Sequence, residues 1–336
     1  MSGKTVHGVK IEPVISDEQR ALIPDITGNE INGLGESAVR RPSPIYWHPP
    51  RRDHPWAPVQ TWMLKKSSRD VPEIADMNNQ LGGRGNKERV PKAPAPTEIT
   101  AEDRTRDIKA FALSHEADLV GITKLQPEWV YDGYEVKDEN VIIVGLKMDQ
   151  PELATAPEPG SVIEVMRAYN QGTRVTRALA DFILAQGFDA EPEGGPIAGK
   201  FTLVPAALAA GFGELGKHGS VINRRFGSSF RLAGVVTNMP LIADDTDDIG
   251  VDDFCRSCIL CETACPPDAI AETKQIVRGV EKWYIDFDKC VPYFNETYGC
   301  GICIAICPWS RPGVAAGLAA KMARKRHKAG TQGESQ

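Results

Sequence analysis

All eight cysteines of this chain lie between Cys255 and Cys307, and their spacing points to iron–sulfur chemistry. The first four follow the pattern C-x2-C-x2-C-x3-C and are directly followed by Pro266. In proteins with two cubane clusters, three thiolates of such a run bind one [4Fe–4S] cluster and the fourth binds the other. A second run, which ends at Cys307 before Pro308, repeats this arrangement with its first cysteine displaced upstream to Cys290.

If the last cysteine of each run binds the cluster of the other run, the eight thiols form two complete sets of four. The first set is Cys255, Cys258, Cys261 and Cys307, and the second is Cys265, Cys290, Cys300 and Cys303. Zinc sites and disulfides are the alternatives, since C-x2-C pairs occur in both. Neither alternative explains a proline after each crossing cysteine or the even division of all eight thiols. We therefore predict two [4Fe–4S] clusters and a protein that transfers electrons.

The composition narrows the class of protein. The chain has 336 residues, enough for about two domains, with 41% hydrophobic residues and a net charge of −6. An acidic balance argues against nucleic acid as the main partner. No stretch reaches the roughly 18 apolar residues of a membrane helix, and the N-terminus lacks the apolar core of a signal peptide. Because cluster ligands must be thiolates during assembly, we expect a reducing, cytoplasmic location without a membrane partner.

Residues 1–99 are rich in proline. Ten of the 25 prolines fall between Pro42 and Pro96, which predicts an irregular segment without long helices. Aromatic residues such as Trp47, Trp56 and Trp62 are interleaved with the prolines, and free disordered tails are usually poor in aromatics. The sequence therefore favours an arm that wraps a folded core over a free tail.

A polar group lies within this arm, at His48, Arg51, Arg52 and His54. Side chains of these types can bind a substrate. Because charged and polar residues are mostly exposed, we predict solvated surface here, with substrate contact as the alternative.

Regular structure is predicted from Thr100 onward, where Thr100 and Asp103 resemble a helix N-cap. The hydrophobic pattern predicts strands over 118–125, 140–148 and 231–238, and helices over 161–186 and 205–210. Gly187 is a candidate C-terminal cap of the long helix. Alternating helices and strands indicate an α/β domain over about 100–245. A bacterial-ferredoxin-type domain follows over 246–312, and then a tail over 313–336 with a basic run at 321–328. Such a run is usually a solvated helix end, and a dock for an acidic redox partner is the alternative.

A glycine-rich stretch separates the last predicted helix from the last predicted strand. Gly211, Gly213, Gly216 and Gly219 allow positive φ angles and close approach of the backbone to a flat ligand. The stretch is not the dinucleotide-binding motif, which requires a preceding strand and an acidic residue about 20 positions later. A plain connection between two elements is the alternative.

This stretch and its surroundings resemble the corrinoid and iron–sulfur reductive dehalogenases. The resemblance rests on AGFGELGKHG at 210–219, RLAGVVTNMPL at 231–241, FCRSC at 254–258 and CPW at 307–309. Epoxyqueuosine reductase, a tRNA-modifying relative, shares the glycine-rich block and both cysteine runs. The match covers about 100–312 and leaves 1–99 without a comparable motif.

The resemblance implies a cobalamin-binding, nitroreductase-like α/β (α+β) domain followed by a ferredoxin-like domain with two [4Fe–4S] clusters. A base-off cobalamin would contact Gly211, Gly213, Glu214, Gly216, Lys217, His218, Gly219 and Val221. No Asp-x-His-x-x-Gly run is present to offer the cobalt a histidine. Reduced cobalt would cleave a carbon–halogen, or else a carbon–oxygen, bond of a small organic substrate. The electrons would come from an external low-potential donor such as ferredoxin or flavodoxin.

The chain departs from its relatives at the expected catalytic positions. Respiratory dehalogenases carry a tyrosine proton donor after the glycine that ends the long helix, a small polar residue in the glycine-rich block and an arginine ahead of the first cysteine. These positions hold Asp189, His218 and Asp252 here, and the catalytic aspartate of epoxyqueuosine reductase is replaced by Ile197. Neither active site transfers intact.

Asp189 and His218 are our candidate catalytic residues. A desolvated carboxyl beside a corrin could have a raised pKa and donate a proton, and histidine is the other ready donor near neutral pH. Tyr169 matches a tyrosine of both relatives, but its helical spacing favours packing.

Two other functions stay open at this point. The first is a ferredoxin-like electron-transfer protein without a corrinoid, and the second is an epoxyqueuosine-reductase-like tRNA-modifying enzyme. An α/β domain in addition to the clusters favours a second cofactor over the first alternative, and the missing aspartate counts against the second.

Overall fold

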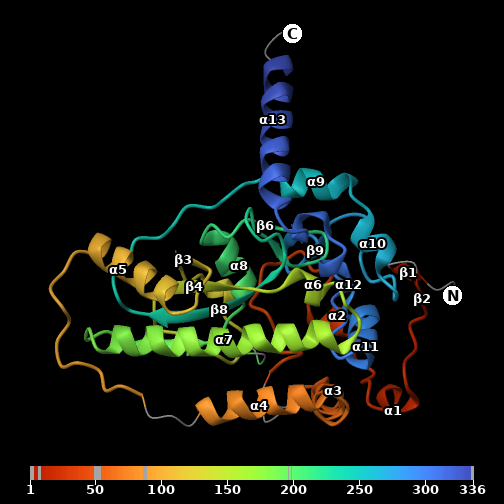
Figure 1. Ribbon diagram of the computed structural model, residues 1–336, viewed down its shortest axis with the longest axis horizontal. Coiled ribbons are helices and arrows are strands. Elements are labelled where there is room, and N and C mark those ends of the chain that lie inside the picture. Colours follow the sequence, from red (N-terminus) through yellow and green to blue (C-terminus); the bar gives the residue numbers. More distant parts are fainter. Residues whose placement is uncertain are drawn as a thin grey trace.

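A four-stranded antiparallel sheet is the framework of the α/β part of the chain (Figure 1). Its strands follow the order β3 (Leu119–Lys124), β4 (Asn140–Lys147), β8 (Phe230–Thr237) and β5 (Ala190–Glu193). The computed structural model describes residues 4–6, 9–48, 54–85, 89–195, 197 and 199–333.

The central strand β4 is buried on both faces, because its side chains serve two separate cores. Ile142 and Val144 pack with the long helix α7 (Pro159–Leu184), while Val141 and Ile143 pack with α8 (Leu203–Ala209) on the opposite face. Alternate residues of a strand point to opposite faces, so one apolar run supplies both layers. Helix α5 (Ala101–Ser114) extends the α7 layer through Ile108 and Ala112.

Strand β5 covers only half of the β8 edge. It pairs with Gly234 to Thr237, and no other described strand pairs with the remaining residues 230–233 on that side. Arg231 and Leu232 are only partly buried, whereas Phe230 and Ala233 to Thr237 are buried. We call residues 230–233 the uncovered edge of β8.

The N-terminal arm contains two long helices, so the prediction of an arm without them is wrong. After the β1–β2 hairpin (Lys4–Val6, Val9–Ile11) and the short helices α1 (Asp17–Arg20) and α2 (Gly28–Ile31) come α3 (Ala57–Asp70) and α4 (Pro72–Gly85). Their prolines lie in the first turn, where a missing N–H costs no helical hydrogen bond. As expected of a wrapping arm, α4 packs on α7, and the Nδ2 atom of Asn170 bonds to the Met77 carbonyl at 3.4 Å.

His48 and His54 are not solvated surface, contrary to the prediction. His48 is fully buried and His54 is 6% exposed. The His48 ring lies edge-on to Tyr131, with the ring centroids 4.4 Å apart. Arg51 and Arg52 of the same predicted group lie outside the described residues.

Short elements form the cysteine-bearing part, in which four of the eight thiols lie in helices and four in the connections between them. Its elements are α9 (Val251–Ser257), α10 (Leu260–Ala264), β9 (Gln275–Val277), β10 (Val280–Lys282), α11 (Phe287–Glu296), α12 (Ile302–Ala305), the 3-10 turn η2 (Pro308–Ser310) and α13 (Ala315–Gly333). Helix α13 projects from the body beside α9 (Figure 1). Among the described helices, none combines the length and apolar character needed to cross a membrane.

Most predicted elements of the α/β part are present. The predicted strands correspond to β3, β4 and β8, and the predicted helices to α7 and α8. The Asp103 N–H donates to Thr100 Oγ1 at 3.1 Å, which confirms the N-cap, and Gly187 has a left-handed φ of 84°. Strand β5, the 3-10 turn η1 (Pro127–Trp129), α6 (Gln150–Leu153) and the β6–β7 hairpin were not predicted. The domain limits at 99, 245 and 312 stay predictions.

Candidate iron–sulfur and reduction site

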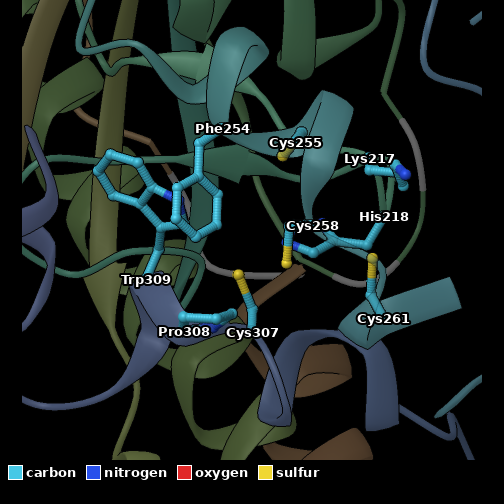
Figure 2. A pocket seen from close by; sticks show the side chains of 9 residues that line it. All are labelled: Lys217, His218, Phe254, Cys255, Cys258, Cys261, Cys307, Pro308 and Trp309. Atoms are coloured by element: carbon cyan, nitrogen blue, oxygen red, sulfur yellow. The ribbon is translucent and has the colours of Figure 1, made fainter. Parts of the chain in front are cut away.

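The first thiol set lines one hollow, although its members are 52 positions apart at the extremes (Figure 2). Helix α9 supplies Cys255, α10 supplies Cys261, the turn between them supplies Cys258, and Cys307 caps η2. The other lining residues are Lys217, His218, Phe254, Pro308 and Trp309. We call this space the thiol hollow.

The second thiol set is also brought together. Burial raises the pKa of Cys303 well above its ordinary value, and Cys300, Cys290 and Cys265 raise it further by their proximity. The backbone around Cys300 is irregular, since Cys300 itself has a φ of 41° and Gly301 one of 84°. Such turns let several consecutive side chains point to one centre. The structure thus groups the eight thiols as their spacing predicts.

The thiols fit iron–sulfur clusters as a donor set. All eight are free, and burial raises the pKa of Cys255 to about 11 and that of Cys261 to about 12. Buried thiols are therefore protonated at neutral pH unless a cation offsets the loss of hydration, and bound iron supplies that positive charge. Within the described residues, no three His, Cys, Asp or Glu side chains approach closely enough to hold a single metal ion. The first set instead surrounds a hollow, as cluster ligands do.

Lys217 gives the wall of the hollow a buried positive charge. Its residue exposure is only 2%, and its Nζ atom lies 3.2 Å from Oε2 of Glu262. The same Nζ lies 5.2 Å from the ring centroid of Trp283, within cation–π range. A backbone hydrogen bond from Lys217 lowers the pKa of Cys255 and partly offsets its burial. The ammonium of Lys217 and its backbone hydrogen bond to Cys255 both favour negative charge in the hollow.

His218 is held in one tautomer by protein groups. The Ser220 N–H donates to Nδ1 at 3.2 Å, so the ring proton lies on Nε2, which faces Ser228 Oγ at 3.2 Å. The Ser228 hydroxyl in turn donates to the Val221 carbonyl at 3.1 Å. Burial lowers the pKa of His218 to about 4, which keeps the ring neutral. With both nitrogens in use, His218 ties the glycine-rich hairpin to the segment that enters β8.

Asp189 lies far from this region. Its side chain is 54% exposed, pairs with Lys92 at 2.7 Å and accepts a hydrogen bond from Asn238 at 3.0 Å. Asn238 follows the last residue of β8, whereas Ser228 precedes the first, and eight strand residues span about 24 Å. The structure therefore does not bring Asp189 and His218 to one site.

Asp252 has a structural role. It accepts a hydrogen bond from Trp283 Nε1 at 3.0 Å and pairs with Lys274 at 2.8 Å and Arg256 at 3.0 Å. Although burial opposes ionisation, these bonds leave the pKa of Asp252 below its usual range. The carboxylate is thus committed to fixing the Trp283 indole.

The glycine-rich stretch folds into the hairpin β6 (Glu214–Leu215) and β7 (Val221–Ile222). A Cβ at Gly213 would lie 2.1 Å from the Ile222 carbonyl, and one at Gly211 would lie 2.6 Å from the Asp245 carbonyl. Glu214 accepts hydrogen bonds from the Ile249 and Val251 N–H groups, at 2.8 and 2.9 Å, and so fixes the start of α9. Close packing of the hairpin thus explains these glycines, while Lys217 and His218 reach the thiol hollow.

Arg231 and Tyr169 form a pair that the sequence prediction missed. The guanidinium carbon of Arg231 lies 5.8 Å from the ring centroid of Tyr169, on the α7 face beside the uncovered edge of β8. The Arg231 Nε is buried without a hydrogen-bond partner, and no carboxylate of the described residues pairs with this arginine. An unneutralised cation beside a phenol suits a ligand that is anionic or becomes so during a reaction. The sequence did contain one signal for this pair, because Arg231 is a charged residue at an inward-facing position of an otherwise apolar strand.

The fold and the thiols together define an iron–sulfur protein with an attached α/β domain. The family model described as a 4Fe-4S dicluster domain matches residues 254–310, which contain all eight cysteines. This match supports the prediction of two [4Fe–4S] clusters.

Curated relatives extend the comparison across the α/β part. Tetrachloroethene reductive dehalogenase of Sulfurospirillum multivorans is 30% identical over 270 residues, which is 66% of this chain and 52% of that protein. The enzyme of the same name from Desulfitobacterium hafniense is 31% identical over 208 residues, covering 58% and 37%. Epoxyqueuosine reductase of Escherichia coli (strain K12) is 36% identical over 115 residues, covering 32% and 29%. The chain spans about half the length of the first of these relatives, and less of the others.

Solved structures show the same fold. A catabolic reductive dehalogenase in complex with 3-bromo-4-hydroxybenzoic acid superposes with a TM-score of 0.66 at 21% identity, over 89% of this chain and 46% of that one. A second solved structure, whose title describes B12-dependent dehalogenation, gives a TM-score of 0.65 at 21% identity over 90% of this chain and 46% of that one. The chain is therefore a relative of the reductive dehalogenases, with epoxyqueuosine reductase more distant.

Proposed function

We propose that this chain is a cobalamin-dependent iron–sulfur reductase that cleaves a carbon–halogen bond of a small organic molecule. Its relatives carry the name of that activity, and one solved neighbour is described as B12-dependent. The observation that carries the proposal is the Arg231–Tyr169 pair beside the uncovered edge of β8. Arg231 follows Ser228 by three residues, and Ser228 bonds to His218 in the wall of the thiol hollow. These contacts support a proton donor and an electron supply near the same end of β8.

The α/β part is proposed to be a nitroreductase-like domain that holds base-off cobalamin. The rim of a corrin carries amide groups, which can pair with backbone groups of residues 230–233 on the side where no described strand pairs with them. Lys217, His218 and Val221 of the hairpin are the proposed contacts nearest the thiol hollow. Bound cobalamin supplies strongly reducing cobalt chemistry that protein side chains lack.

The chain's own residues supply the proton and the charge balance. Tyr169 donates the proton, and Arg231 stabilises the negative charge that develops on the phenol oxygen or on an anionic substrate. No described residue forms a hydrogen bond with the Tyr169 phenol oxygen, which leaves it available to a ligand. His218 stays in the proposal as a positioning residue, and Asp189 has no part in it because of its distance.

The overall reaction consumes two electrons and one proton, and it converts a carbon–halogen bond into a carbon–hydrogen bond and a halide ion. The clusters receive these electrons from an external low-potential protein such as ferredoxin or flavodoxin. The proposed substrate is a small halogenated aromatic molecule of the kind bound by the solved relative. A carbon–oxygen bond is the alternative target of the same chemistry.

Anaerobic reconstitution tests the proposal. The protein is loaded with iron, sulfide and hydroxocobalamin, freed of unbound cofactor, and incubated with reduced methyl viologen and 3-bromo-4-hydroxybenzoate. We expect about eight irons per chain, a base-off cobalt signal in the electron paramagnetic resonance spectrum, and bromide release. Iron without retained cobalamin would instead support a plain electron-transfer protein.

A further inference from the structure

We infer that the outer face of α9, α10 and α13 is a docking surface for an acidic electron-carrier protein, which reduces the cluster of the first thiol set. This face is defined by Arg256, Ile259, Leu260, Lys321, Arg324 and Lys325. The inference deepens the proposed function by naming where electrons enter, and it relies on that proposal only for the presence of clusters.

The first thiol set lies close to the protein surface on this face. Ile259 and Leu260 lie between the thiols of Cys258 and Cys261, and they are 55% and 39% exposed. Large apolar side chains at the surface are typical of sites that another protein covers. Here they belong to the very turn that holds two thiols of the hollow, so a partner seated on them lies next to the cluster.

The N-terminal arm packs on one side of the second thiol set, of which Cys290, Cys300 and Cys303 are partly exposed. Helix α11, which carries Cys290, is held by Gln19, whose Nε2 donates to the Pro292 carbonyl at 3.0 Å. The Gly28 N–H donates to Asp288 at 2.6 Å, and Val291 packs in one apolar cluster with residues of the arm. Because the arm already occupies this side of α11, a partner protein has a freer surface at the turn between α9 and α10.

The charge of the face is positive although the sequence before it is acidic. Five of the six aspartates between 244 and 253 are in ion pairs. Their partners are Lys109, Arg224, Arg256, Lys274 and Arg326. By contrast, Lys321, Arg324 and Lys325 are exposed and have no ion pair within the described part of α13. The unneutralised charge on this side therefore comes from α13.

Helix α13 is fixed relative to α9. Met322 is 4% exposed and packs against Gly250, the residue that precedes α9, while Arg326 pairs with Asp253 at 2.7 Å. Asp253 and Cys255 both belong to α9, so this ion pair joins α13 to the helix that carries the first thiol of the set. Figure 1 shows α13, α9 and α10 following one another at the same end of the molecule.

An acidic carrier is the partner that this charge selects. Complementary charge mainly raises the association rate, and salt reduces that gain. In each encounter the reduced carrier loses one electron and an oxidised [4Fe–4S] cluster gains it. Two encounters supply the electron pair that one reductive cleavage consumes, and no proton crosses this interface.

The test compares two triple charge reversals in the reconstituted full-length protein. Lys321→Glu, Arg324→Glu and Lys325→Glu alter the proposed face. The matched control, Lys65→Glu, Lys124→Glu and Lys147→Glu, makes the same change in net charge at exposed lysines of α3, β3 and β4. Stopped-flow absorbance measures the second-order rate constant for cluster reduction by a reduced, acidic [4Fe–4S] ferredoxin.

We expect the α13 variant to be reduced at least about tenfold more slowly at low ionic strength, and near the wild-type rate at high salt. The control variant should stay within about twofold of wild type. Photoreduced deazaflavin, a small reductant, should reduce all three proteins equally. An additional variant, Ile259→Asn, should slow reduction by ferredoxin with little dependence on salt.

An α13 variant that ferredoxin reduces at the wild-type rate, or a control that slows equally, would overturn the inference. So would a wild-type rate that does not change with salt. The assay requires neither cobalamin nor an organic substrate. A protein that accepts electrons through this face but releases no halide would therefore contradict the proposed activity and leave the docking surface intact.

Discussion

The buried ammonium of Lys217 and the carboxylate of Glu262 lie 3.2 Å apart, and only the lysine lines the thiol hollow. The pair is not needed to neutralise free thiols, which burial already keeps protonated. When a cluster occupies the hollow, its reduction adds a negative charge next to Lys217. The two charges of the pair then affect the reduction potential of that cluster. The two residues thus act in opposite directions on that electron.

Lys217→Met should lower the reduction potential of the first cluster, and Glu262→Gln should raise it. Removal of the ammonium destabilises the reduced cluster, whereas removal of the carboxylate leaves the ammonium unopposed. A tenfold change in the equilibrium constant corresponds to about 59 mV for one electron, and we expect shifts of that order. A redox titration monitored by electron paramagnetic resonance measures them. Shifts of the same sign in the two variants would contradict this account.

Lys274→Met is the matched control for that experiment. Lys274 lies 5.8 Å from the Trp283 ring centroid and is paired with Asp252, but it does not line the hollow. Its loss should shift the potential less than the loss of Lys217, because solvent screens its charge.

Tyr169→Phe should reduce turnover by about 10²–10⁴-fold with little change in KM. The substitution keeps the ring over which the Arg231 guanidinium lies, 5.8 Å from its centroid, and removes only the hydroxyl that we propose as the proton donor. Steady-state halide release, measured with cobalamin content checked by absorbance, gives the two constants. If the variant binds cobalamin and retains full turnover, another group must be the proton donor.

Asp189→Asn serves as the control for proton donation. The side chain is half exposed and paired with Lys92, about a strand length from the proposed site. We therefore expect kcat and KM within about twofold of wild type. A large loss of turnover in this variant would restore the role that its position after the long helix suggested.

Sequence patterns predicted the elements whose apolar period is strong, and missed those that tertiary contacts create. The run in β4 and the face of α7 have clear periods, whereas β5 is four residues long and consists of Ala190, two glutamates and Pro192. A proline is tolerated there because β5 is an edge strand. Such a strand exists only because β8 offers its edge, which no local pattern reveals.

In the candidate site, too, some features could be predicted from the sequence and others only seen in the structure. The grouping of the thiols follows from spacing, because the ligand pattern is local. The Arg231–Tyr169 contact depends on how β8 and α7 pack, and the lack of a counter-ion for Arg231 is visible only in three dimensions. Similarly, Asp189 and His218 belong to opposite ends of β8, a separation that their places in the sequence do not show.

Glu193→Gln should stabilise the protein at alkaline pH. Glu193 is 7% exposed, and burial raises its pKa to about 7, with the Lys200 N–H as its hydrogen-bond donor. Between about pH 4.5 and 7 the unfolded carboxyl ionises first, so the free energy of unfolding falls with rising pH, by up to about 3 kcal/mol. Glutamine keeps the acceptor and removes this ionisation. The gain in Tm over wild type should therefore be larger at pH 8 than at pH 5, and exposed Glu128→Gln should show no such trend.

The buried amide of Gln19 joins the N-terminal arm to α11, and its loss should expose the second cluster. Its Nε2 donates to Pro292 and to Glu296, at 3.0 and 2.8 Å, and its Oε1 accepts from Asn295 at 3.0 Å. Gln19→Ala leaves these buried groups without partners, at a cost of about 2–4 kcal/mol. We expect a lower Tm and faster loss of about four irons per chain to a chelator, measured by absorbance. Exposed Glu18→Ala on the same short helix should change neither, and equal iron loss in both variants would show that the arm does not protect this cluster.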